Sequence, residues 1–246
     1  MIYFLGKCVQ NLILSIKYMF SGNNRFITVL NQAAAISYDS LIISLVIVFV
    51  AAAVIAIQVS KQFLMTGAEA YIGGSIAIVM IREIAPGFVA LAIGARAGTA
   101  ISAEIANMKV TSQVDAIKTL KVEPVGYYFS PRLMAAAITV PMVVLLAELI
   151  GILGGLVVAN ATIALHPARY INSVWLWLST RDIYISLFKA FIFGILISLV
   201  CATQGYETKG GAKDVGISTT KAAIKSTIYL LITDLLINIV FYSLLL

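Results

Sequence analysis

The sequence predicts an all-α protein that crosses a membrane several times. The chain of 246 residues is 61% hydrophobic and only 11% charged, whereas about a quarter of the residues in a soluble domain are charged. Its apolar runs are continuous and rich in Leu, Ile, Val and Ala. They lack the alternation of apolar and polar residues that marks a transmembrane β-barrel. Together these observations favour a bundle of transmembrane helices.

Five apolar segments are long enough to be transmembrane helices. The hydrocarbon core of a bilayer is about 30 Å thick, and a helix needs roughly 20 apolar residues to cross it. Before the first of these segments, apolar stretches alternate with polar and basic residues, which favours helices that lie on the membrane surface. We therefore expect an amphipathic surface segment over residues 1–40 and a transmembrane domain over residues 41–246. The expected spans are residues 41–59, 74–103, 133–158, 184–203 and 228–246.

Basic residues are distributed by membrane side. They gather before the first span, between the second and third, and between the fourth and fifth, so the positive-inside rule predicts a cytoplasmic N-terminus and an outer C-terminus. The net charge of +6 is not concentrated in a patch interleaved with aromatic residues, which argues against nucleic-acid binding. The basic residues of the three segments are Lys7, Lys17, Arg25, Lys109, Lys118, Lys121, Arg132, Lys209, Lys213, Lys221 and Lys225.

The second span contains a proline and a pair of glycines. Pro86 removes the amide that would have bonded the carbonyl of Arg82, which predicts a kink. Small residues four apart allow two helices to approach closely. Such pairs pack helices either within one chain or across a dimer interface, and they are Gly94 with Gly98 and Gly151 with Gly155.

A short polar segment separates the second and third spans. Ser112 and Asp115 resemble a capping box, and the segment ends at Pro124. It is too short and too polar to cross the bilayer, so we expect a helix on the cytoplasmic surface over about residues 104–123. Ser130 and Pro131 then suit the cap and the first residue of the third span. Apolar residues recur at helical spacing in the polar segment, namely Val114, Ile117 and Leu120.

Ionisable residues lie inside the apolar segments. Such residues are costly in a bilayer and usually mark function. Most of them fall at similar depth, which suggests one cluster. All of them except Arg96 either pair among themselves to hold the bundle together, or line a cavity for an amphipathic ligand whose anionic head group meets Arg82 or Lys189. The six residues are Arg82, Glu83, Arg96, Glu148, Lys189 and Asp234.

The sequence offers no catalytic or metal site. His166 is the single histidine and has no companion residues at metal-ligand spacing. No G-x-x-x-x-G-K-[ST] motif occurs, so ATP chemistry would require another polypeptide. We expect neither catalysis nor a cofactor in this chain.

Several short motifs follow one another in order along the chain. The most specific are Arg82-Glu83 with Ala85-Pro86, Arg96-Ala97-Gly98, Ala103-Glu104-Ile105, Met108-Lys109-Val110-Thr111, Gln113 with Asp115-Ala116, Pro124, and Pro131-Arg132. Later motifs are the GY...GGA..VG...TT loop after residue 204 and the aspartate of the last span. In this order the motifs resemble the MlaE/YrbE family of permeases, and the resemblance runs from about residue 32 to the C-terminus.

The resemblance implies the permease subunit of an ABC transporter that moves lipids, glycerophospholipids above all. The family pattern implies a homodimer with a lipid cavity between the two copies, an ATPase subunit that binds ATP and Mg²⁺, and an MCE protein on the outer side. It implies a bacterial inner membrane, or alternatively the inner envelope of a plastid.

The resemblance also implies roles for particular residues. Residues 104–123 would form the coupling segment that transmits motion from the ATPase, with Glu104, Lys109, Gln113, Asp115, Ile117 and Leu120 as its contacts. The charged membrane residues of the family correspond to Arg82, Glu83, Lys189 and Asp234.

The sequence departs from the family pattern in places, and two other functions stay open. Ser37 follows Ile36 where the family has Ile-Gly, alanines occupy residues 51–53 where it has Phe-x-Gly, and Glu148 has no expected counterpart. One alternative is a proton-coupled secondary transporter that uses Glu83, Glu148 and Asp234. The other is a membrane scaffold whose charges only hold helices together.

Overall fold

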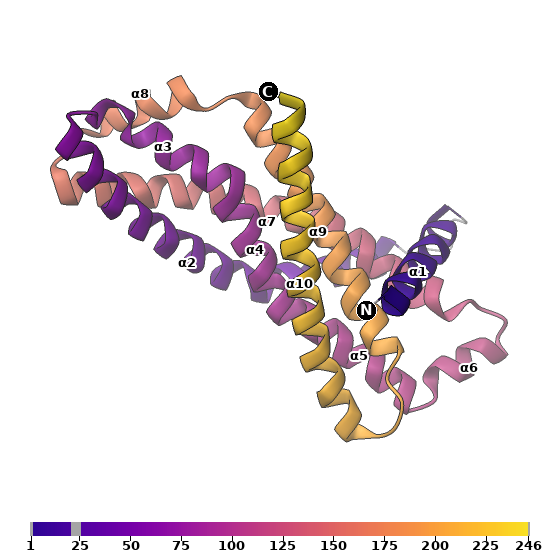
Figure 1. The fold of residues 1–246 in the computed structure, drawn as a ribbon. Helices are drawn as coiled ribbons and strands as arrows, with labels where there is room; N and C mark the ends of the chain where they lie inside the picture. Colours follow the sequence, from indigo (N-terminus) through magenta and orange to yellow (C-terminus); the bar gives the residue numbers. More distant parts are fainter. Residues whose placement is uncertain (1, 21–25, 246) are drawn as a thin grey trace. The chain divides into compact units, whose positions relative to one another are not determined.

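The computed structural model describes residues 2–20 and 26–245, and within these residues it contains helices and no strands (Figure 1). Arg25 and Leu246, which the sequence analysis placed before the first span and at the end of the last, lie outside the described residues. The α-helices are α1 (Ile2–Phe20), α2 (Phe26–Thr66), α3 (Ile72–Val79), α4 (Ala85–Ile93), α5 (Thr99–Val110), α6 (Gln113–Thr119), α7 (Pro124–Ile163), α8 (Pro167–Trp177), α9 (Thr180–Tyr206) and α10 (Ala212–Leu245).

Five helical segments of the described chain are long and apolar enough to cross a membrane. Four of them contain a span predicted from the sequence, and the fifth overlaps the predicted span 228–246 up to Phe241, so the all-α polytopic fold is confirmed. The segments are Phe26–Thr66, Glu69–Val110, Pro124–Ile163, Thr180–Tyr206 and Ala212–Phe241.

The second span is interrupted twice by π-helical turns, at Met80–Ile84 and at Gly94–Gly98. At the first turn the amide of Ala85 donates to the carbonyl of Met80, five residues earlier. Pro86 follows and has no amide to continue the helical ladder. Pro86, where the sequence predicts a kink, therefore directly follows a π-helical turn, a feature often found at functional sites.

The chain divides into two compact units, which we describe separately. Unit 1 comprises Met1–Ser40, Ala90–Val140 and Phe191–Leu246, and unit 2 comprises Leu41–Val89 and Pro141–Ala190. In unit 1, α10 packs against α5, and α1 is tied to α9 by a hydrogen bond of 3.1 Å from the Asn11 amide to the Thr203 hydroxyl. In unit 2, α8 packs beside α3 (Figure 1).

Residues 104–123 form two helices, whereas the sequence predicted one. α5 ends at Val110 and α6 begins at Gln113. Ser112 lies between them with a left-handed φ of 61° and makes no side-chain cap hydrogen bond, so the capping box predicted there is wrong. A capping serine needs an extended backbone to reach the amides of the first turn, and the turn between α5 and α6 does not provide one.

The start of the third span is also corrected. α7 begins at Pro124, and Ser130 and Pro131 lie inside it, buried, so the prediction that they start the helix is wrong. Pro124 suits a first helical position because it lacks an amide and its φ is already helical. At the N-terminal side, α2 runs without a break from Phe26 to Thr66, past the boundary expected at residue 40.

Candidate functional site

Lys189 of α9 is the centre of an ionic cluster in unit 2. Its side chain is 1% exposed, and its Nζ donates to Glu83 Oε1 at 2.9 Å and to the carbonyl oxygen of Arg82 at 2.8 Å. That carbonyl cannot be bonded by the residue four positions later, because Pro86 has no amide. The proline thus leaves an acceptor in the membrane that the buried ammonium satisfies.

Arg82 has its own buried counter-ion. Its Nε donates to Asp182 Oδ1 at 2.7 Å, and the Asp182 side chain is 5% exposed. The other carboxylate oxygen, Oδ2, accepts from the amide of Ser179 at 3.0 Å. Since α9 begins at Thr180, Ser179 and Asp182 form the reciprocal contact of a capping box. The Asp182 carboxylate therefore both caps the N-terminus of α9 and pairs with the charge of Arg82.

Sequence reasoning missed Asp182, because it lies just before the predicted fourth span and was assigned to an outer loop. The sequence nevertheless contains a signal that α9 begins before Asp182. Ser179 and Asp182 have the S-x-x-D spacing of a capping box immediately before an apolar run, which marks a helix start. We call Arg82, Glu83, Asp182 and Lys189 the charge cluster.

Glu148 of α7 lies apart from these ion pairs. Its side chain is buried, at 4% exposure, and it accepts a short hydrogen bond from the hydroxyl of Ser186. Ser186 lies one turn after Asp182 and one turn before Lys189 on α9, so all three occupy one face of that helix. Glu148 therefore contacts the same face of α9 through a hydroxyl group.

The charge cluster combines buried and accessible groups. Asp182 and Lys189 are almost fully enclosed, whereas the side chains of Arg82 and Glu83 are 33% and 38% exposed. Each accessible group is thus held by a buried partner of opposite charge. Such an arrangement can present one guanidinium and one carboxylate, in fixed positions, to a charged group that enters the membrane region.

The structure brings together three of the four intramembrane residues implied by the resemblance: Arg82, Glu83 and Lys189. Asp234 lies on α10 in unit 1, where its side chain is partly exposed. Its membership of the charge cluster stays a prediction. Arg96 also belongs to unit 1, in the second π-helical turn.

Three of the four paired glycines lie at close contacts within their own unit. A Cβ added to Gly98 would stand 2.8 Å from Cys201 Sγ, and one added to Gly151 would stand 2.7 Å from Met80 Cε. A Cβ on Gly155 would stand 2.6 Å from the Tyr170 hydroxyl. Gly94 has ordinary van der Waals neighbours, with Ile197 at 3.7 Å.

In unit 1, the coupling segment is joined to α7 by an ion pair. Arg132 Nη2 donates to Glu104 Oε2 at 2.7 Å, and its Nη1 donates to the carbonyl of Tyr128 at 2.7 Å. Arg132 is buried whereas half of the Glu104 side chain is exposed. The Arg132 Nε is buried without a hydrogen-bond partner.

Elsewhere in the coupling segment, Ile105, Ala106 and Val114 are buried, whereas most of the charged side chains are exposed. Asp115 pairs with Lys118 at 3.3 Å and with Lys109 at 3.8 Å, and its side chain is 59% exposed. Leu120, directly after α6, is 74% exposed. Exposed ion pairs of this kind contribute little to stability. The segment therefore offers polar side chains and one apolar side chain to a partner.

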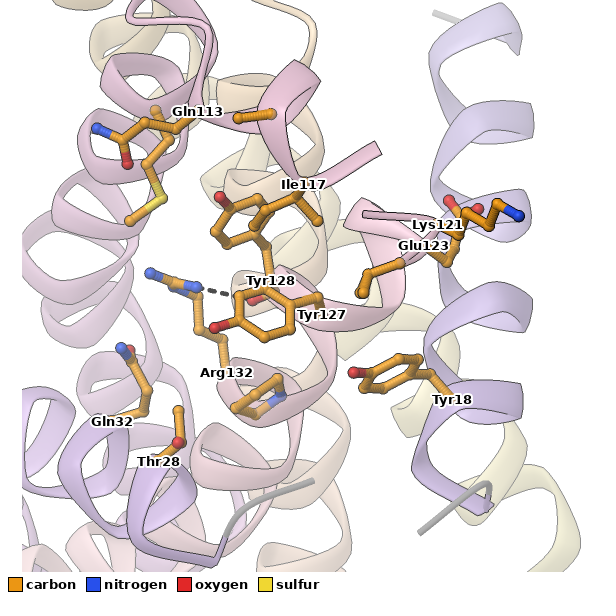
Figure 2. Close-up of a pocket in the computed structure, with 14 residues that line it drawn as sticks. Tyr18, Thr28, Gln32, Gln113, Ile117, Lys121, Glu123, Tyr127, Tyr128 and Arg132 are labelled. Carbon is orange, nitrogen blue, oxygen red and sulfur yellow. Dashed lines mark hydrogen bonds between the residues drawn. The ribbon is translucent and has the colours of Figure 1, made fainter. Parts of the chain in front are cut away.

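An open cavity of about 1300 Å³ borders the coupling segment. Figure 2 shows the Tyr18 ring of α1 directed toward Tyr127 and Tyr128 of α7, with Thr28 and Gln32 of α2 on another side. Gln113 and Ile117 of α6 also line it, so the coupling segment forms one wall. The remaining lining residues are Met108, Ala116, Lys121, Val122, Glu123, Pro131 and Arg132.

α1 is attached to the same unit by a charged contact. Lys7 pairs with Glu207, which follows α9. This hydrogen bond raises the pKa of the Lys7 ammonium, so Lys7 stays charged at neutral pH. Burial raises the pKa of the nearby Cys8 thiol, which keeps it protonated and unreactive. In the described residues, no group of three or more His, Cys, Asp or Glu side chains is arranged to hold a metal ion.

Comparison with known proteins places these features in a family. Residues 29–240 match the family described as Permease MlaE. A probable ABC transporter permease protein of Synechocystis sp. is 34% identical over 209 residues, covering 85% of this chain and 80% of that protein. One from Rickettsia prowazekii is 36% identical over 215 residues, covering 87% and 83%. The protein TRIGALACTOSYLDIACYLGLYCEROL 1, chloroplastic, of Arabidopsis thaliana is 29% identical over 187 residues, covering 76% and 53%.

The match spans all five membrane-crossing segments and includes both the charge cluster and the coupling segment. Most of each bacterial relative is covered, so the likeness extends beyond a shared motif. This chain is a multi-pass membrane protein and belongs to the MlaE family of ABC transporter permeases.

Proposed function

We propose that this permease moves lipids, principally glycerophospholipids, between the inner membrane and an MCE partner, and that a separate ATPase subunit supplies the energy. The observation that carries the proposal is the charge cluster. It presents a partly exposed Arg82 beside a partly exposed Glu83 within a membrane-spanning segment, each held by a buried counter-ion. The name of the Arabidopsis relative includes the word chloroplastic, which supports a plastid as the alternative location.

The chemistry of the cluster suits an amphipathic substrate. Arg binds phosphate through charge-assisted hydrogen bonds, and a neighbouring carboxylate can accept from an amine or hydroxyl of the same head group. The flanking helices α3 and α4 are apolar, so acyl chains would meet compatible surfaces. A head group at Arg82 and Glu83 with its chains among these helices is therefore the arrangement that we propose.

We infer that the chain works as a homodimer beside an MCE protein. α10 carries large apolar side chains that are about half exposed, and they recur at helical spacing on one face: Ile228, Leu231, Leu235 and Ile239. A transmembrane helix with such a face fits either lipid or a second copy of the chain. The MCE partner would take up or deliver lipid on the predicted outer side.

The coupling segment is the part that we propose for ATPase contact. The chain has no nucleotide-binding motif, so ATP and Mg²⁺ would be bound by the partner. Leu120 is an exposed apolar side chain flanked by the exposed Lys118 and Lys121. Because a lone apolar residue ringed by charges suits insertion into a pocket of another protein, we assign Leu120 to the contact.

The test is lipid-stimulated ATP turnover by the reconstituted permease and ATPase, compared between Leu120→Asp and Ala212→Asp. Both positions are exposed, and both variants add one carboxylate on the predicted cytoplasmic side. An interface hot-spot residue contributes more than about 1 kcal/mol, so we expect Leu120→Asp to lower turnover about tenfold. Ala212→Asp should act like the unmodified chain. Equal turnover in both variants would contradict the proposal that Leu120 contacts the ATPase.

A parallel measurement addresses the substrate. Fluorescent glycerophospholipid is followed from permease-containing vesicles to the purified MCE protein, with and without ATP. The proposal expects ATP-dependent transfer that Arg82→Gln abolishes. Transfer driven by a proton gradient without ATP would instead support the secondary transporter with Glu83, Glu148 and Asp234. A purified complex that contains neither lipid nor ATPase would support the scaffold.

A further inference from the structure

α8 lies close to the ends of two membrane spans. It begins three residues after α7 ends at Ile163 and ends at Trp177, two residues before α9 begins at Thr180. His166 accepts from the amide of Ala168 and caps the helix. Linkers of two and three residues span roughly 10 Å at most. The helix therefore cannot lie far from the membrane boundary at which α7 ends and α9 begins.

One face of α8 is fixed to the rest of unit 2. Tyr170 and Ser173 are buried, and the Ser173 hydroxyl accepts from the amide of Gly74 at 2.9 Å. A Cβ added to Gly73 would stand 2.3 Å from the carbonyl oxygen of Tyr170, so only glycine permits this approach. The Tyr170 hydroxyl donates to the carbonyl of Ile152 in α7 at 3.1 Å. α8 is thus held rigidly against α3 and α7.

The opposite face of α8 carries large apolar side chains. Ile171, Trp175 and Leu176 are 46%, 76% and 82% exposed. The exposed Arg169 lies beside them on the same helix. A short amphipathic helix with Trp and Leu on one face and a basic residue at its margin has the composition of a helix that lies in the membrane interface. Trp is enriched at that level because its ring is amphipathic.

We propose that α8 lies in the lipid head-group layer, with Ile171, Trp175 and Leu176 inserted at the boundary with the acyl chains. The occupant of this face is the lipid surface, because the short linkers hold the face at the depth where head groups begin. Three large apolar side chains would otherwise stand in water, and their burial in lipid contributes about 25 cal/mol per Å² of apolar surface.

The position of α8 in the head-group layer would set the depth of the charge cluster in the membrane. Arg82 follows Gly74, the residue in contact with α8, by eight positions along one nearly continuous helical segment. At about 1.5 Å per residue, the backbone of Arg82 lies at most about 12 Å below the contact with α8. That depth is close to the middle of a bilayer whose hydrocarbon core is about 30 Å thick. The position of α8 would therefore fix the depth of Arg82 and Glu83 in the bilayer.

The test uses tryptophan fluorescence, because the two tryptophans of the chain are both in α8. Trp177→Phe leaves Trp175 as the sole reporter in the full chain, reconstituted in phosphatidylcholine nanodiscs. We expect lipid brominated at acyl carbons 6 and 7 to quench its emission by about half, lipid brominated at carbons 11 and 12 to quench it less, and aqueous iodide to quench it weakly. Strong iodide quenching without bromolipid quenching would overturn the proposal.

A second variant distinguishes insertion of α8 into lipid from contact of α8 with a protein partner. In the Trp177→Phe background, Leu176→Asp should reduce bromolipid quenching of Trp175 at least twofold and shift its emission to longer wavelength. Thr180→Asp adds the same charge at an exposed, polar position and should change neither. If Trp175 becomes shielded from iodide only when a protein partner is added, the face is a protein interface and the proposal is wrong. The readout involves no transport, so it stands apart from the proposed function.

Discussion

The charged groups of the two units differ in what surrounds them. In unit 2, Lys189 and Asp182 are 1% and 5% exposed, and each holds a partly exposed partner. In unit 1, Asp115 and Lys118 of the coupling segment are 59% and 50% exposed. Removal of one partner strands a charge in an apolar environment in unit 2 but leaves a solvated charge in unit 1. We therefore expect the former pairs to contribute more to the stability of the fold than the latter.

The largest effect is expected at Lys189. Lys189→Met removes the buried ammonium and leaves the Glu83 carboxylate and the Arg82 carbonyl without it. The Glu83 carboxylate is 38% exposed but lies in a membrane-spanning segment, where an unpaired charge costs about 2.5–3.5 kcal/mol, so the variant should unfold at much lower temperature in nanodiscs. Lys118→Met should change stability by about 0.5 kcal/mol or less. Equal loss of stability in both variants would contradict the expectation that the buried ion pairs of unit 2 stabilise the protein more than the exposed pairs of unit 1.

A double-mutant cycle tests whether Arg82 and Asp182 act as a pair. Arg82→Gln leaves the buried Asp182 carboxylate unmatched, and Asp182→Asn leaves the partly exposed Arg82 unmatched. The Asn side chain retains an oxygen for the Ser179 amide that Asp182 bonds. The double variant removes both charges. Its loss of stability in chemical denaturation should be smaller than the sum of the single losses, by about 1–3 kcal/mol. Additive losses would show that the contact at 2.7 Å carries no coupling.

Arg132 in unit 1 is an intermediate case. It is buried, but its partner Glu104 is half exposed. Arg132→Gln removes hydrogen bonds to Glu104 and to the carbonyl of Tyr128, and we expect a loss of about 1–3 kcal/mol. Glu104→Gln should cost less, because it retains an acceptor in partly solvated surroundings. The reverse order, measured by thermal unfolding of both variants, would contradict the burial argument.

The comparison also explains what could be predicted from the sequence. Long apolar runs identify spans because each must satisfy its backbone inside the bilayer, and all five appear in the structure. Short motifs were less reliable. Two S-x-x-D segments occur, at Ser112 and at Ser179, and only the latter forms a capping box. The choice between them depends on whether the backbone before the helix is extended, and four residues do not encode that.

Contacts between residues that are distant in sequence were also not predicted. Pro86 indicated that the carbonyl of Arg82 needed a donor, but nothing local identifies Lys189 as that donor. Asp182 was missed because hydropathy placed it outside the span, although it lies in the first turn of α9. α8 was assigned to a loop, since a helix of 11 residues with one apolar face gives a weak hydropathy signal. Each of these features depends on tertiary packing within unit 2.

The smallest effect on stability is expected at Asp115, and there the distinction between the units is sharpest. Asp115→Asn removes exposed ion pairs with Lys109 and Lys118, which should change the free energy of unfolding by about 0.5 kcal/mol or less. Because Asp115 belongs to the proposed ATPase contact, lipid-stimulated ATP turnover should nevertheless fall several-fold. Lys213→Gln, an exposed change outside the coupling segment, should leave both quantities unchanged. A fall in turnover accompanied by a matching loss of stability would mean that Asp115 supports the fold of unit 1, since a residue that only contacts a partner has no reason to lower the melting temperature of the isolated permease.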